Sequence, residues 1–169
     1  MGIFTPDLTN LRELYTTKLK KALNMEKQIV EKGLPTMIEN ATSPELQNAF
    51  RTHLEESREQ QARLEQILTE YTGEVDDASC PAIKALIGEG SSDASDAKDA
   101  TLRDVVLISG GNEIEHHEIA VYGTLINWAN VLGESQHVTL LEKSLAEEKN
   151  ADKLLTQLAE EINVEAPVA

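Results

Sequence analysis

Aromatic residues, cysteine and basic residues are all scarce in this chain of 169 residues. Phe, Trp and Tyr make up 4 % of the sequence, which argues against a large all-β domain, because strands favour aromatic and β-branched side chains. The single cysteine, Cys80, excludes an internal disulfide and fits a reducing compartment. Lys and Arg number 15 against 30 acidic residues, so the clustered positive charge that binds nucleic acid is missing.

Long hydrophobic runs are also missing. The longest aliphatic run, residues 105–108, is far too short to cross a bilayer. The first residues contain no basic stretch followed by an apolar run, and Pro6 stands where a myristoylation signal needs Ser or Thr. We therefore expect a cytoplasmic protein that binds neither membranes nor nucleic acid. Its length predicts a single domain over residues 1–169, since domains usually hold about 100–200 residues.

Helical periodicity dominates the N-terminal part of the sequence. The first predicted helix begins near Thr5, with Pro6 in its first turn, and Gly33 and Pro35 should disturb its last turns. Its apolar stripe consists of Leu11, Tyr15, Leu19, Ala22 and Ile29. The second helix is predicted over residues 44–71, with Ser43 as its N-cap.

Two further helices are predicted in the C-terminal part. One begins near Thr101, where Asp104 completes a variant of the capping box, and continues to Val131. The other follows the turn around Gly133, takes Ser135 as its N-cap, and ends near residue 162.

The pattern therefore consists of two helical hairpins, about 6–71 and 101–162, joined by a long connection over about 72–100. The connection contains an apolar piece at 82–87 and an acidic tract at 88–100, expected to be a solvated loop or a short helix. This anatomy predicts an all-α, antiparallel four-helix bundle with one crossover between helices two and three. Two independent hairpins are the alternative, but each would leave its apolar stripe in water.

Acidic side chains interrupt the apolar stripe of every predicted helix. Glu26 fills the gap in the first stripe, and Glu148 lies between the apolar residues of the fourth. The inner face of the second helix contains His53, Glu56 and Gln60. The third helix carries Glu115 and Glu118 on the face of Tyr122, and Asp152 follows Glu148 by one turn. A carboxylate in a bundle core is costly unless it is paired or bound to a metal.

The spacing of these acids places them at one level of the bundle. Glu26 and Glu56 are 30 residues apart around a turn at residue 41, and Glu118 and Glu148 are 30 apart around Gly133. Residues equidistant from a hairpin turn lie at about the same level, here roughly 22 Å from each turn at a rise of about 1.5 Å per residue. All four acids are therefore predicted to meet in one layer.

Such a layer needs cations, because several carboxylates in a low-dielectric core cannot all remain charged alone. No Lys or Arg is expected to point inward at these positions, and Arg63 comes nearest to doing so. His53 and His116 are the nearest imidazoles. Carboxylates with imidazole suit iron, manganese or zinc, and in helical bundles they bridge two such ions. We therefore predict two divalent metal ions, with iron favoured. A purely polar layer, or acids rotated outward, is the alternative. His117 and His137 are expected to be exposed.

Several segments give the chain a specific resemblance. It resembles the bacterial YciF/YciE stress-response family, ferritin-like proteins once catalogued as a domain of unknown function. The most specific segment is 115–125 (EHHEIAVYGTL). The other matching segments are 25–28 (MEKQ), 41–46 (ATSPEL), 53–57 (HLEES), 63–66 (RLEQ), 147–149 (EEK) and, more loosely, 82–87 (AIKALI).

The resemblance implies a ferritin-like four-helix bundle related to rubrerythrins, a homodimer, and a di-metal site. The family's acids fall on Glu26, Glu56, Glu115, Glu118 and Glu148, with His53 close by. Together with the helical phase, this predicts these six residues as the metal ligands. The residues expected next to them are Gln60, His116, Tyr122 and Asp152. One departure from the wider ferritin-like pattern concerns the histidines that follow the metal-binding Glu of helices two and four by three residues. Glu59 and Ala151 occupy those positions here, and a histidine precedes Glu56 instead.

We therefore expect a ferritin-like di-metal carboxylate protein of the bacterial stress response. If it is an oxidoreductase, it oxidises Fe(II) or reduces peroxide, with a redox partner that the sequence does not identify. The alternative is a structural or partner-binding stress protein whose metal site is stabilising or vestigial. Iron storage in a hollow shell is a third possibility.

Overall fold

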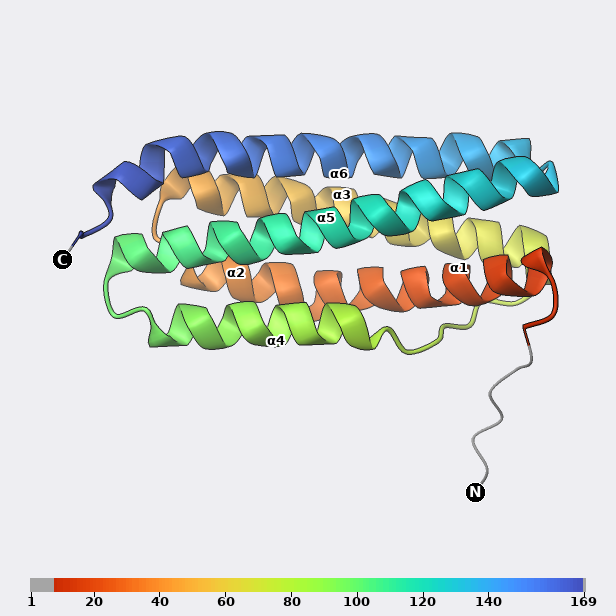
Figure 1. Cartoon of the computed structure of the whole chain (residues 1–169), viewed down its shortest axis with the longest axis horizontal. Helices are drawn as coiled ribbons and strands as arrows, with labels where there is room; N and C mark the ends of the chain where they lie inside the picture. Colours follow the sequence, from red (N-terminus) through yellow and green to blue (C-terminus); the bar gives the residue numbers. More distant parts are fainter. Residues whose placement is uncertain (1–7, 169) are drawn as a thin grey trace, which may run out of the picture.

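All regular elements of the described residues, 8–168, are helical in the computed structural model (Figure 1). They are α1 (Leu11–Gln28), the π-helical turn η1 (Ile29–Gly33), α2 (Leu34–Asn40), α3 (Pro44–Thr72), α4 (Pro81–Asp96), α5 (Ala100–Leu132), α6 (Ser135–Ile162) and the 3-10 turn η2 (Asn163–Glu165). The predicted all-α bundle is confirmed. None of the described helices has a stretch long and apolar enough to cross a membrane.

Two hairpins form the body of the bundle, in which α1, η1 and α2 make one nearly continuous rod beside α3, while α5 pairs with α6 (Figure 1). The turn before α3 agrees with the prediction, because the Ser43 side chain accepts a hydrogen bond from the Leu46 N–H at 3.3 Å. Gly73 and Gly133 end α3 and α5 with φ angles of +80° and +81°, which glycine adopts without steric cost.

The starts of the other long helices differ from the predictions. Helix α1 begins at Leu11, where the Asn10 side chain accepts from the Glu13 N–H at 3.0 Å. The predicted start at Thr5 and Pro6 lies outside the described residues. Helix α6 begins at Ser135 itself and has no side-chain N-cap, so the expected cap there is wrong.

Helix α5 is capped by Asp99 rather than Thr101, since the Asp99 side chain accepts from the Leu102 N–H at 3.0 Å. Asp104, which was expected to complete that cap, instead accepts from the backbone N–H groups of Thr42 and Ser43 at 2.7 and 2.8 Å. This buried carboxylate therefore ties α5 to the turn of the first hairpin.

The crossover contains a full helix, α4, of 16 residues, which takes up most of the tract expected to be a loop or short helix. Pro81 occupies its first turn, and Ile83 and Ala94 bury its inner face. A Cβ atom on Gly110 would lie 3.5 Å from the Gly90 Cα, so two glycines let α4 approach α5 closely. Small residues in this tract thus serve helix packing rather than flexibility.

The disturbance expected near Gly33 and Pro35 is a π-helical turn. Within η1 the Leu34 N–H donates to the Ile29 carbonyl, five residues earlier. The wider turn absorbs a residue without breaking the rod, and Ile29 and Leu34 at its two ends are both buried.

Candidate metal centre

A cluster of four buried side chains lies at mid-height of the bundle. His53 from α3, Glu115 and Glu118 from α5 and Glu148 from α6 each offer one ligand atom, and these atoms lie within 4.8 Å of one another. Their residues are 0–5 % exposed. The predicted convergence of acids from different helices at one level is therefore present, and it includes His53.

Glu26 adds a fifth buried group from α1. It is fully buried, and Tyr122 on α5 donates a hydrogen bond from its hydroxyl to Glu26 Oε1 at 2.5 Å. Its charge interacts with Glu118 and Glu148, which places it beside the cluster. Tyr122 was predicted to lie next to the site, and it contacts the cluster region through Glu26.

Glu56 is placed differently from the other predicted ligands. Its side chain is 38 % exposed, and its carboxylate lies 3.4 Å from His53 Nδ1. The other ring nitrogen, His53 Nε2, lies 3.2 Å from Glu115 Oε1 and 3.5 Å from Glu148 Oε2. Glu56 therefore orients the imidazole from the solvent side, at the edge of the buried cluster.

Most of the buried polar atoms in this layer have no hydrogen-bond partner. They are both oxygens of Glu118 and of Glu148, one oxygen each of Glu26 and Glu115, and His53 Nε2. A buried polar atom without a partner costs about 1–3 kcal/mol, and charged groups cost more. The protein alone leaves this layer unsatisfied.

The electrostatics of the layer follow from burial and mutual repulsion. Burial, followed by repulsion from Glu148, raises the pKa of Glu26 to about 8. The same two causes raise the pKa values of Glu115 and Glu118 well above the ordinary range. Burial also raises the pKa of Glu148, although His53 opposes the rise. For His53, burial lowers the pKa, but the carboxylates around it outweigh burial and raise it overall.

A bound cation removes both difficulties at once. It gives the unpartnered oxygens and the free imidazole nitrogen a ligand, and its charge offsets the repulsion among the carboxylates. Oxygen donors with one imidazole suit iron, manganese or zinc. The donor set therefore fits a metal ion, and the buried cluster can hold one.

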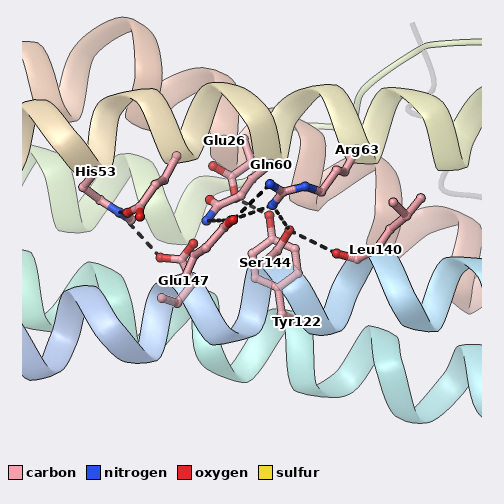
Figure 2. A network of polar contacts seen from close by, with 10 residues as sticks. Glu26, His53, Gln60, Arg63, Tyr122, Leu140, Ser144 and Glu147 are labelled. Atoms are coloured by element: carbon pink, nitrogen blue, oxygen red, sulfur yellow. Dashed lines mark hydrogen bonds and ion pairs between the residues drawn. The ribbon is translucent and has the colours of Figure 1, made fainter.

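Arg63 is the one Lys or Arg side chain in residues 8–168 that is buried, and it does not serve the cluster. Its guanidinium donates to both oxygens of Glu147 and, at 3.1 Å, to Ser144 Oγ (Figure 2). The predicted neighbour Gln60 also donates to Glu147, at 3.1 Å. Sequence periodicity placed Gln60 on the inner face of its helix but predicted no inward arginine, so the buried pair of Arg63 and Glu147 is seen only in the structure.

His116 and Asp152 contact one another, and the charge of Asp152 is one of the smaller causes that raise the pKa of Glu115. The His116 side chain is 70 % exposed, and its Nε2 lies 3.2 Å from Asp152 Oδ1. Asn112 donates to the same oxygen at 2.7 Å. Their expected position beside the metal is not matched by any polar contact with His53, Glu115, Glu118 or Glu148 in the described part of the chain.

The expected exposure of two histidines is wrong. His137 is 4 % exposed, and its Nδ1 lies 3.2 Å from the Tyr15 hydroxyl. His117 is half-buried, with Nε2 4.0 Å from the Cys80 sulfur. Neither position could be found from periodicity, because both side chains are covered by elements from elsewhere in the chain.

Comparison with known proteins places the chain in a family. The model of the family described as "Domain of unknown function (DUF892)" matches residues 10–166. The chain belongs to the DUF892 family. This DUF892 protein is 31 % identical over 154 residues to Protein YciF of Escherichia coli K12, covering 90 % of this chain and 92 % of that relative. The predicted family resemblance is therefore confirmed.

Solved structures of similar proteins share the fold of this DUF892 chain. The E. coli stress protein YciF superposes with a TM-score of 0.88 at 29 % identity, covering 94 % and 100 % of the two chains. YcfI of Rhodopseudomonas palustris, provisionally described as a structural protein, gives 0.87 at 36 %, covering 91 % and 98 %. A protein from Xanthomonas campestris gives 0.72 at 26 %, covering 92 % and 95 %. The chain is thus a homologue of YciF stress proteins.

Proposed function

We propose that this DUF892 protein is a ferritin-like di-metal carboxylate protein that serves in the bacterial stress response. The observation that carries the proposal is the buried layer of carboxylates from α1, α5 and α6, with oxygens that no protein group satisfies. The stress-related role rests on homology to the YciF stress proteins.

Charge balance favours two divalent ions over one. Glu26, Glu115, Glu118 and Glu148 together carry four negative charges when ionised, which two divalent cations neutralise. One cation would leave two buried charges uncompensated, at a cost of several kcal/mol. Arg63 does not supply that compensation, because Glu147 occupies its guanidinium.

The residues around the layer have separable roles in this proposal. Glu26, Glu115, Glu118, Glu148 and His53 hold the ions, Tyr122 orients Glu26, and Glu56 orients His53 from the solvent side. Iron is the favoured metal, and manganese and zinc suit the same donors. With redox-active ions bound, the site would support oxidation of Fe(II) or reduction of peroxide.

Metal analysis of protein purified without chelator tests the proposal. We expect about two equivalents of Fe, Mn or Zn in the wild type, and loss of most of that metal in the Glu118→Gln, Glu148→Gln double variant. Glu142→Gln, an exposed position on the same helix, is the matched control and should keep the metal. A metal-free wild type, or a double variant that retains the metal, contradicts the proposal.

A second candidate is a non-catalytic structural protein whose metal stabilises the bundle. Glu59 and Ala151 stand where the wider ferritin-like pattern has histidines, and YcfI is described as structural. Oxygen or peroxide consumption after Fe(II) addition separates the two candidates. Turnover beyond one reaction per site favours the oxidoreductase, whereas a raised melting temperature without turnover favours the structural protein.

The assembly and location of the protein complete the proposal. We propose a cytoplasmic homodimer with no membrane or nucleic-acid partner. Size-exclusion chromatography with light scattering tests the assembly, because a dimer excludes storage of iron inside a hollow shell.

A further inference from the structure

A small cavity lies against the candidate metal centre, on the side nearer the turn of the first hairpin. Two of the residues that line it, His53 and Glu115, belong to the buried cluster. The other lining residues are Ile29, Leu34, Met37, Phe50, Gly111 and Ile114. All of these residues are buried. The cavity therefore belongs to the interior of the bundle, next to the acidic layer.

The walls of this cavity offer few hydrogen bonds. His53 and Glu115 are the polar members of the lining, and both hold metal ions in the proposed function. The remaining side chains contain no nitrogen or oxygen. The cavity has room for one molecule of about the size of water. Because a buried water needs about two to four polar partners, an apolar cavity of this kind stays dry. Its occupant must be small and must need no hydrogen bond.

The π-helical turn η1 supplies part of the wall. Its hydrogen bond joins the Leu34 N–H to the Ile29 carbonyl, and the side chains of both residues line the cavity. In a regular α-helix, residues five apart point about 140° away from one another. The wider turn instead lets both side chains face the same space, and π-turns inside α-helices are frequent at functional sites.

The backbone of Gly111 on α5 forms another part of the wall. Glycine is unfavourable inside a helix, so its presence calls for a packing reason. A Cβ atom there would lie 2.8 Å from Leu155 Cδ1 and 3.6 Å from Phe50 Cε1. Any side chain at this position would displace Leu155, and the shape of the cavity wall therefore depends on this glycine.

We propose that this cavity binds dioxygen next to the metal centre. Dioxygen is apolar, is only slightly larger than water and needs no hydrogen bond, so it matches both the size and the walls of the cavity. Hydrogen peroxide fits poorly, because its two hydroxyl groups would lose their hydrogen bonds to water without replacement. This inference rests on the proposed function, since it names dioxygen rather than peroxide as the molecule that reaches the metal ions from this side.

Proton NMR of the chelator-treated protein under oxygen pressure tests the cavity, because dissolved dioxygen is paramagnetic and speeds the relaxation of nearby protons. Ile29 and Ile114 line the cavity and are 1 % and 4 % exposed. Ile67 and Val121 are 0 % and 4 % exposed and lie outside the lining, so they are matched controls within the same sample. We expect oxygen to speed the relaxation of the first pair of methyl groups severalfold more than that of the second. Equal effects on the two pairs would overturn the proposal.

Two substitutions on α5 extend the test. Ile114→Phe fills the cavity and should remove most of the oxygen effect at Ile29. Ile126→Phe, about three turns later and outside the lining, should preserve it. Urea unfolding shows whether each variant is folded. Ile29→Ala approaches the same question from the other side, because it enlarges the cavity and should strengthen the oxygen effect at Ile114. A folded Ile114→Phe with an undiminished effect, or magnetisation transfer from bound water to these methyl groups, would contradict a dry site for dioxygen.

Zinc(II), which is diamagnetic and undergoes no redox chemistry, separates this inference from the proposed function. Its addition should shift the ring signals of His53 and leave the oxygen effect at Ile29 in place. If the wild type binds no zinc, iron or manganese, the proposed function is wrong. If zinc binds and oxygen has no selective effect at Ile29 and Ile114, only the dioxygen site is wrong.

Discussion

Two buried polar regions of this bundle differ in how well the protein satisfies them. At one end, where α1 and α6 begin and α3 ends, Tyr15, Tyr71 and His137 pack against one another with ring centroids 5.3–6.1 Å apart. The Tyr15 hydroxyl meets His137 Nδ1, and the Tyr71 hydroxyl accepts from Arg12 at 3.0 Å. At mid-height, the carboxylates of Glu118 and Glu148 meet no donor at all.

The difference separates a structural polar region from a binding site. In the aromatic end (Tyr15, Tyr71 and His137), no buried side-chain nitrogen or oxygen is left without a hydrogen-bond partner, so these side chains stabilise the fold without a ligand. In the layer, the carboxylates repel one another, and their oxygens can gain partners only from a bound ion or ligand. Both regions bury polar atoms. They differ in whether the protein itself provides hydrogen-bond partners for those atoms.

The largest expected effect is the pH dependence of the metal-free protein. Because the pKa of Glu26 is raised from 4.5 to about 8, the folded state holds a proton that the unfolded chain releases. Stability should therefore fall as the pH rises from 5 to 8, and Glu26 alone contributes a fall of about 3–4 kcal/mol. Urea unfolding with chelator present measures the fall. Glu26→Gln should make the fall smaller without abolishing it, because Glu115, Glu118 and Glu148 keep raised pKa values. A fall of the same size in that variant would contradict the assignment.

Removal of the His137 ring should be the next largest effect. His137→Ala deletes a buried ring that stacks on Tyr15, and we expect a loss of about 2–3 kcal/mol in the free energy of unfolding. Metal content should stay at the wild-type level, because the ring belongs to the aromatic end. His116→Ala, at an exposed position, is the control. Loss of metal from His137→Ala would show that the aromatic end also contributes to metal binding, against this prediction.

Deletion of one hydroxyl from each region compares them directly. Tyr15→Phe removes the partner of His137, and Tyr122→Phe removes the donor to Glu26. Each should cost about 1 kcal/mol of stability. Only Tyr122→Phe should alter Co(II) affinity, as measured by titration. Equal affinities in the two variants would show that Tyr122 has no influence on the metal site.

The smallest expected effect is the titration of His137, and its sign is opposite to that of Glu26. Burial lowers the pKa of His137, against the opposing charges of Glu134 and Glu70. The unfolded chain therefore binds a proton more readily, so this contribution to stability is present above about pH 6.5 and is lost as the pH falls. An NMR titration that gives His137 a pKa above that of a free imidazole would contradict it.

Much of the helical architecture could be predicted from local sequence. The turn at Ser43–Pro44, the stop at Gly73 and the chain reversal at Gly133 each depend on a residue whose own chemistry selects that conformation. Helix α4 was harder to predict, because its glycine-rich, acidic stretch has weak helix propensity and is held by packing on α5. The sequence predicted where the first helix is disturbed, near Gly33, but not that the disturbance is a π-helical turn. Gly33 packs against Ile87 of α4, a contact between elements that local sequence does not reveal.

Most of the candidate site was also within reach of the sequence. Glu26, Glu118 and Glu148 lie on the apolar faces of their own helices, and a side chain on such a face must enter the core wherever the bundle closes. Glu56 shared that pattern but remains partly exposed, because the rotation of α3 brings His53 rather than Glu56 against α5 and α6. Periodicity has a precision of about one residue position, which is too coarse to choose between neighbours on one face.

The sequence by itself determined that acids must be buried in this bundle, because the phase of a side chain relative to its own apolar stripe is a local property. The sequence also predicted that few basic side chains would be buried with these acids. Only the tertiary structure decided which charges meet. Arg63 pairs with Glu147 and leaves the layer without a cation, and His137 is covered by Tyr15. Those outcomes depend on the relative rotation of packed helices, which no single helix encodes.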